Sequence, residues 1–279
     1  MVRIGAFNTL KINKVVDFGV YLDGGDLGDV LLPKKSAPDD IQIGDDLEVF
    51  IYLDSEDRII ATTKTPYAKV GEFANLEVVE VNKIGAFLDW GLEKDLLVPF
   101  SEQKQRLEVG KRYVVFIYID RVDRRITASA KIDKFLDQVS PNYEQGQQVS
   151  LMIGGRSDLG FKAIINNTHW GVIYKDDVFE YLSIGSRKQG FIKRMREDGK
   201  IDVTLSKPAG DQRDELSDRV LKELNKLGGY LAIGDKSPPD VIYKKFRVSK
   251  RIYKQTIGGL FKQGLITIEP KGIRLKEKK

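Results

Sequence analysis

Short runs of β-branched and aromatic residues, bounded by glycine, aspartate or proline, recur through the first three quarters of this 279-residue chain. LEVFIYL (47–53) and YVVFIYI (113–119) are typical, and both are too short for helices. The spacing predicts about five strands in each unit of about 70 residues. Such a unit is best explained by a small closed barrel of the OB type, with an SH3-like barrel as the alternative.

After Gly210 the apolar period becomes helical. A first helix is predicted over 214–227, ending before two glycines. A second is predicted in 238–246, and a third runs from a Ser249 cap to Gly264. The segment 265–275 then predicts two strands around a Pro-Lys-Gly turn. Three helices and a hairpin are similar to a winged helix. The predicted apolar stripe of the first helix is Leu216, Val220, Leu224 and Leu227.

The barrel region repeats itself. Shifting the chain by 66 positions aligns twenty identical residues, where chance would supply roughly four. A weaker match at an offset of 75 indicates a diverged third copy. The predicted units are 1–66, 67–140 and 143–208, followed by a winged helix at 211–279, with linkers around Pro141 and from Lys207. Recurring glycines are expected inside strands where a barrel must bend: Gly19, Gly85 and Gly160.

A recurring phenylalanine lies between inward-facing residues of the fourth strand in each unit. Alternation along a strand places these side chains on the outer face of the barrel. We expect them to pack between barrels or against a covering helix, and not to form a platform for bases. The three residues are Phe50, Phe116 and Phe191.

The segment VVDFGVYLD (15–23), followed by LLP, GDDLEV and D-R-I, resembles the S1 RNA-binding domain of the OB-fold superfamily. The resemblance implies two aromatics flanking a glycine on the nucleic-acid face. Repeat one supplies Phe18 and Tyr21, whereas repeat two supplies only Phe87 because Ile84 takes the first aromatic position. The third repeat has Leu159 and Lys162 at these positions.

Exposed aromatic rings on a barrel wall can stack any base, because every base has a π-face. Nearby cations are then expected to contact the phosphates. The alternative is that Phe18 and Tyr21 are half-buried wall residues without a ligand. The predicted cationic contacts are Lys14, Arg58, Lys83, Arg124, Arg125 and Lys162.

Charge is distributed unevenly along the chain. The net charge of +5 combines −5 for residues 1–66 with +8 for residues 211–279. A basic C-terminal end favours a polyanionic partner, although a solvated basic face or a protein-binding winged helix would show the same charge. The predicted contacts of the winged helix are Lys244, Lys245, Lys250, Arg251, Lys254, Lys262 and Lys271.

Composition excludes much enzyme chemistry. Zero cysteines and one histidine, His169, exclude disulfides, cysteine nucleophiles and histidine-cluster metal sites. We expect no catalytic residue, metal or cofactor, and a structural or surface role for His169. The chain lacks an apolar run of 18 residues and a signal-like N-terminus, so a cytoplasmic monomer is expected. The recurring carboxylates Asp54, Asp57, Asp120 and Asp123 are more simply turn residues than magnesium ligands.

Three S1-type barrels followed by a winged helix resemble the conserved virulence factor B (YitL-like) family of bacterial RNA-binding proteins. The resemblance implies a non-enzymatic regulator of gene expression that acts after transcription and binds single-stranded RNA. One alternative is a DNA-binding transcription regulator that reads duplex through the winged helix. The second alternative is a metal-dependent nuclease.

Overall fold

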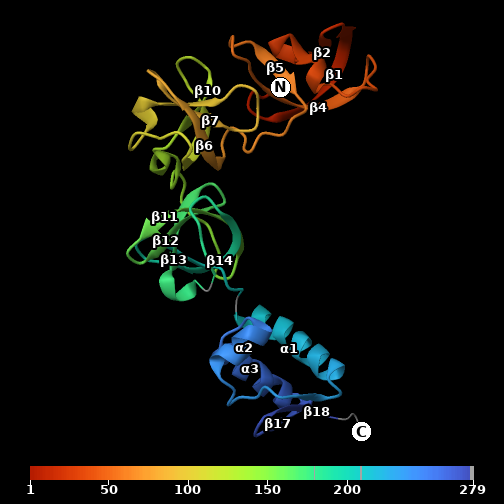
Figure 1. Ribbon diagram of the computed structural model, residues 1–279, viewed down its shortest axis with the longest axis vertical. Coiled ribbons are helices and arrows are strands. Elements are labelled where there is room, and N and C mark those ends of the chain that lie inside the picture. The colour runs from red at the N-terminus through yellow and green to blue at the C-terminus, as the bar shows by residue number, and fades with distance from the viewer. Residues whose placement is uncertain (179, 208, 277–279) are drawn as a thin grey trace.

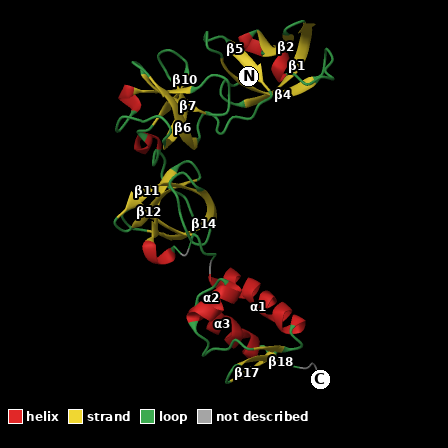
Figure 2. Cartoon of the chain, viewed as in Figure 1, coloured by secondary structure: helices red, strands yellow, loops and turns green. Residues whose placement is uncertain are grey.

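Four units follow one another along the chain in this computed structural model, which describes residues 1–178, 180–207 and 209–276. Three β units come first and a mainly helical unit last (Figures 1 and 2). The predicted fold class, mainly β with a small α+β end, is confirmed. Pro208 of the predicted linker and residues 277–279 lie outside the described residues. No helix in the described ranges is long and apolar enough to cross a membrane.

The first unit is a closed five-stranded barrel with the strand order β1-β2-β3-β5-β4. Antiparallel ladders join most neighbours, and a parallel contact between Leu31 and Ile60 closes the barrel. Inward-facing residues such as Leu22 and Ile51 are completely buried. The strands are β1 (Phe7–Val16), β2 (Gly19–Asp23), β3 (Asp29–Pro33), β4 (Asp46–Leu53) and β5 (Ile59–Thr62).

The second and third units repeat this strand order. In the second, β8 and β10 lie side by side without a hydrogen-bonded ladder, whereas β13 and β15 close the third barrel in parallel. The prediction of five strands per unit is therefore confirmed. The second unit contains β6 (Phe73–Val81), β7 (Gly85–Asp89), β8 (Leu96–Pro99), β9 (Arg112–Ile119) and β10 (Ile126–Ser129). The third contains β11 (Gln148–Ser157), β12 (Gly160–Ile165), β13 (His169–Tyr174), β14 (Arg187–Met195) and β15 (Ile201–Thr204).

The prediction that the recurring glycines lie inside strands is wrong, because each of them is the first residue of the second strand of its barrel. A Cβ on Gly19 would lie 2.3 Å from the backbone oxygen of Leu32, and one on Gly160 would lie 2.2 Å from that of Ile173. These glycines therefore permit the close approach of a neighbouring strand. In the first barrel, this tight corner immediately follows Phe18.

The recurring phenylalanines join consecutive units, as predicted. Phe50 is completely buried in the same apolar cluster as the core of the second barrel, and its ring meets that of Trp90 edge-on with the two centroids 5.9 Å apart. Phe116 stacks on Phe135 of the following segment, in a cluster that also contains Met152 of the third barrel. Phe191 is buried and lines a cleft shared with the winged helix.

The C-terminal unit contains the three predicted helices and the hairpin. Ser249 caps the third helix by accepting a hydrogen bond from the backbone N–H of Ile252, as predicted. The prediction that Leu227 belongs to the apolar stripe of the first helix is wrong, because this residue follows the end of the helix and is 49% exposed. A two-residue strand that was not predicted completes the sheet. The elements are α1 (Ala209–Lys226), β16 (Tyr230–Leu231), α2 (Pro239–Phe246), α3 (Lys250–Lys262), β17 (Ile266–Glu269) and β18 (Gly272–Leu275).

His169 has the structural role that was expected. It is 4% exposed, and its Nε2 lies 2.8 Å from the backbone oxygen of Val139. Its Nδ1 lies 2.9 Å from the Tyr143 hydroxyl. These contacts fasten the segment that enters the third barrel to β13.

Candidate nucleic-acid interface

An aromatic corner lies on the wall of the first barrel. Phe18 is 59% exposed in the turn before Gly19, and Tyr21 is half-buried on β2. Their rings are nearly perpendicular, with centroids 6.3 Å apart. Lys14, exposed on β1, is the ladder partner of Tyr21. An apolar ring face and a cation are therefore available to solvent on one wall.

The corresponding wall of the second barrel lies at its junction with the first. Phe87 and Ile84 line a cleft of about 420 Å³ that also includes Asp57 from the first barrel. Phe87 is half-buried and Ile84 is 51% exposed, while Lys83 is exposed in the preceding turn. The predicted stacking residue of repeat two thus lies in a cleft between barrels, whereas Phe18 lies on an open wall.

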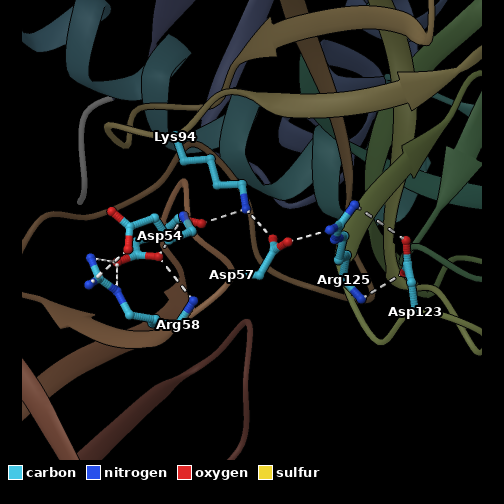
Figure 3. Close-up of polar contacts among 7 residues, drawn as sticks. Asp54, Asp57, Arg58, Lys94, Asp123 and Arg125 are labelled. Atoms are coloured by element: carbon cyan, nitrogen blue, oxygen red, sulfur yellow. Dashed lines mark hydrogen bonds and ion pairs between the residues drawn. The ribbon is translucent and has the colours of Figure 1, made fainter.

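Two predicted cationic contacts take part in ion pairs within the protein (Figure 3). The Arg125 guanidinium pairs with Asp57, to which Lys94 Nζ also donates a 2.8 Å hydrogen bond. Arg58 pairs with Asp54 at 2.8 Å and keeps 68% of its side chain exposed. Arg124 is exposed, in a turn position with φ of 62°. The ion pair between Arg125 and Asp57 therefore joins the first two barrels, whereas the ion pair of Arg58 lies within the first barrel.

The recurring carboxylates form turns, as predicted. The Asp54 Oδ1 accepts hydrogen bonds from the backbone N–H groups of Glu56 and Arg58, at 2.9 and 3.0 Å. Asp120 accepts one from Val122 at 2.7 Å. Among the described residues, no group of three or more His, Cys, Asp or Glu is arranged to hold a metal ion.

We expect acid to weaken the junction of the first two barrels through Asp57. The hydrogen bond from Lys94, with the charges of Lys94 and Arg125, lowers the pKa of Asp57 below its usual value. A carboxyl whose pKa is lower in the folded state adds stability above its unfolded pKa, about 3.9, and loses it as pH falls through the folded value. Between about pH 4 and pH 2, the Tm of the wild type should fall further than that of Asp57→Asn. Calorimetry at both pH values measures this, and an equal fall would contradict it.

The third barrel carries different chemistry at the same positions. Leu159 is 56% exposed. The Lys162 ammonium lies 4.1 Å from the centroid of the Trp170 ring and 3.7 Å from Asp133, which belongs to the segment between the barrels. Trp170 Nε1 donates to the same carboxylate at 3.1 Å. Lys162 therefore already has an aromatic and an anionic partner.

The predicted winged-helix cations differ in their surroundings. Lys250 is half-buried, and Lys245 pairs with Glu223 of α1. The N-terminal part of α3 and the third barrel line a shared cleft of about 640 Å³ that includes Arg251 and Lys193. Sequence reasoning did not single out Lys193, whose ammonium pairs with Asp177 of the same cleft at 2.6 Å. Its only signal in the sequence was the small basic excess of the third repeat. The other predicted cations are exposed: Lys244, Lys254, Lys262 and Lys271.

Comparison with known proteins agrees with this architecture. The S1 domain model matches residues 4–64 and 70–131, and the CvfB-like winged helix domain model matches residues 218–275. The third barrel lies outside both matches. The chain is therefore a nucleic-acid-binding protein that joins S1 domains to a winged helix.

Its relatives extend over most of its length. It is 29% identical to the uncharacterized protein YitL of Bacillus subtilis over 273 residues, covering 95% of this chain and 91% of YitL. It is 25% identical to conserved virulence factor B of Staphylococcus saprophyticus, covering 86% of this chain and 83% of the relative. YitL and conserved virulence factor B are therefore homologues of this chain over most of its length.

A solved structure of similar length is described as a multidomain protein with nucleic acid binding domains from Streptococcus pneumoniae. It is 22% identical, with a TM-score of 0.42, and the match covers 98% of each chain.

Proposed function

We propose that this protein binds single-stranded RNA through its S1 barrels, with the basic winged helix assisting. The observation that carries the proposal is the exposed Phe18 beside Tyr21 on the wall of an S1 barrel. A ring exposed in this way can stack an unpaired base, whereas the bases of a duplex are already stacked on one another. The protein acts without turnover as a regulator after transcription.

In this proposal the chain is a cytoplasmic monomer with four domains, and RNA is its partner. The domains span 1–66, 67–140, 143–208 and 211–279. The barrel walls supply stacking, and the basic end supplies phosphate contacts. These different roles agree with the charges of the two ends of the chain, which are −5 for the first barrel and +8 for the last domain.

The position of α3 favours a single strand over a DNA duplex. In a winged helix that reads duplex, the start of this helix contacts base edges in a major groove. Here Ser249, Arg251 and Gln255 line a cleft with the third barrel. A cleft of this size beside the start of the helix suits a single strand better than a duplex.

Fluorescence anisotropy tests the proposal directly. The full-length protein is titrated into single-stranded RNA and duplex DNA of equal length, over a series of salt concentrations. Tighter binding of RNA at physiological salt is expected, and equal or tighter binding of random duplex would contradict it. The RNA should remain intact in magnesium. Cleavage that disappears in Asp57→Asn with Asp123→Asn would show that the protein is a nuclease.

Removing two charges from α3 should reduce the salt dependence of RNA binding. Arg251→Gln with Lys254→Gln deletes two predicted phosphate contacts, each worth about 0.7 of log-log slope on a single strand. The slope of log K against log salt should therefore become shallower by about 1.4. Lys111→Gln with Arg112→Gln removes the same charge from the exposed start of β9 in the second barrel and should leave the slope unchanged. An unchanged slope in the α3 variant would mean that this face contacts something else.

A further inference from the structure

Asp95 is a half-buried carboxylate without a hydrogen-bond donor among the described residues. It directly precedes β8, and alternation along the strand places it on the same side as Leu97, the ladder partner of Phe87. All three line the cleft of about 420 Å³ between the first two barrels. Burial, and the nearby negative charges of Asp89 and Glu80, raise the pKa of Asp95 above its usual value.

Comparison with the first repeat shows which hydrogen-bond donor Asp95 lacks. Asp29 is the equivalent of Asp95, and its Oδ1 accepts a 3.1 Å hydrogen bond from Asn13 Nδ2. Asn13 lies in the bulge of β1. The bulge of β6 recurs at the matching place, but its residue is Val79, which has no side-chain donor and is 44% exposed. The second repeat thus keeps the carboxylate and lacks the amide that satisfies it in the first.

We propose that Asp95 determines base specificity in the second barrel by accepting a hydrogen bond from the exocyclic amino group of a base stacked on Phe87. This rests on the proposed function, single-stranded RNA binding. The cleft then binds cytosine in preference to uracil. An ionised carboxylate only accepts hydrogen bonds, and cytosine presents the N4 amino group to it. Uracil presents O4 at that position, and its imino N–H lies between two carbonyl oxygens that repel the carboxylate.

The cleft has the size and walls for such a ligand. Its volume lies within the usual range for small-molecule sites. The other carboxylates on its wall already have cationic partners: Glu93 pairs with Lys35 and Lys64, and Asp57 pairs with Lys94 and Arg125. Asp95 is therefore the carboxylate on this wall that a base can satisfy.

Homopolymeric RNA of 12 nucleotides tests the inference, with oligo(C) and oligo(U) compared by anisotropy on the full chain. Oligo(C) should bind the wild type about tenfold more tightly than oligo(U) does, which is the effect of one hydrogen bond to a charged group. Asp95→Asn should bring this preference to within about twofold, because an amide can donate to uracil O4. Glu80→Gln is the control. It removes a negative charge from an exposed residue outside the cleft lining and should keep the preference.

Val79→Asn provides a second test that leaves the carboxylate in place. The new amide should pair with Asp95 as Asn13 pairs with Asp29, so oligo(C) affinity should fall while oligo(U) affinity stays the same. Equal wild-type affinities for the two oligonucleotides, or a preference for cytosine that survives Asp95→Asn, would overturn this inference and leave the proposed function standing. If neither oligonucleotide bound, the proposed function would fall as well.

Discussion

Replacing Phe18 and Tyr21 together with alanine should weaken RNA binding by about 2–4 kcal/mol, which is about 30- to 1,000-fold. Each aromatic can stack one base, worth about 1–3 kcal/mol, and the remaining contacts adjust so that the losses do not fully add. Phe18 is 59% exposed, so its removal leaves the barrel core intact. The loss should persist at high salt, because stacking releases no counterions.

Anisotropy at two salt concentrations, together with a melting curve, measures this effect. Leu159→Ala is the matched control, since Leu159 is an exposed residue at the Phe18 position of the third repeat and has no ring to stack. It should leave affinity nearly unchanged. A large drop in Tm with normal affinity in the folded fraction would show that the two aromatics support the barrel instead. The binding site would then have to lie in the second barrel and the basic C-terminal end.

Phe50→Ala should cost about 3–5 kcal/mol of stability, the usual range for a buried phenylalanine. The ring is completely buried, contacts Phe7 and Trp90 edge-on, and belongs to the same apolar cluster as the core of the second barrel. Its removal leaves a cavity at the junction, where both barrels lose contacts. The first barrel should therefore unfold at lower urea concentration and separately from the second.

Urea denaturation, followed by the fluorescence of Trp90 and Trp170 and by far-UV circular dichroism, measures this loss. Phe18→Ala removes the same side chain from an exposed position and should change stability by less than about 0.5 kcal/mol. Coincident, unshifted transitions in Phe50→Ala would show that the two barrels do not depend on this contact.

Much of the fold could be predicted from the sequence because the barrels repeat. Alternation placed Phe50 outside its own barrel, and the recurrence of this residue indicated that neighbouring units pack on it. The helices of the last unit followed from their period and from the Ser249 cap. β16 was missed because its two residues, Tyr230 and Leu231, are too few to show a period. Leu227 was misplaced because a helical wheel does not show that the helix has ended.

The aromatic positions could also be predicted, but their surroundings could not. Those surroundings depend on contacts between units, which no local pattern contains. Arg125 meets Asp57 because two turns from different barrels come together, and Lys162 meets Asp133 because the connecting segment folds back onto β12. To predict that the Asp95 carboxylate lacks a hydrogen-bond donor, one would need to know the register of β8. One would also need to know that Val79 stands where the first repeat has the donor Asn13.

The buried junctions at Phe50 and Phe116 have a further consequence for how RNA affinity should depend on the length of the strand. Barrels joined by flexible tethers would let a short strand pull two sites together, at an entropic cost that grows slowly with tether length. Here the apolar clusters hold the first three barrels in fixed succession. The distance between the proposed base-stacking surfaces of neighbouring barrels is therefore fixed by the protein. A strand too short to span that separation gains nothing from the second wall, so avidity should rise in a step as the strand lengthens.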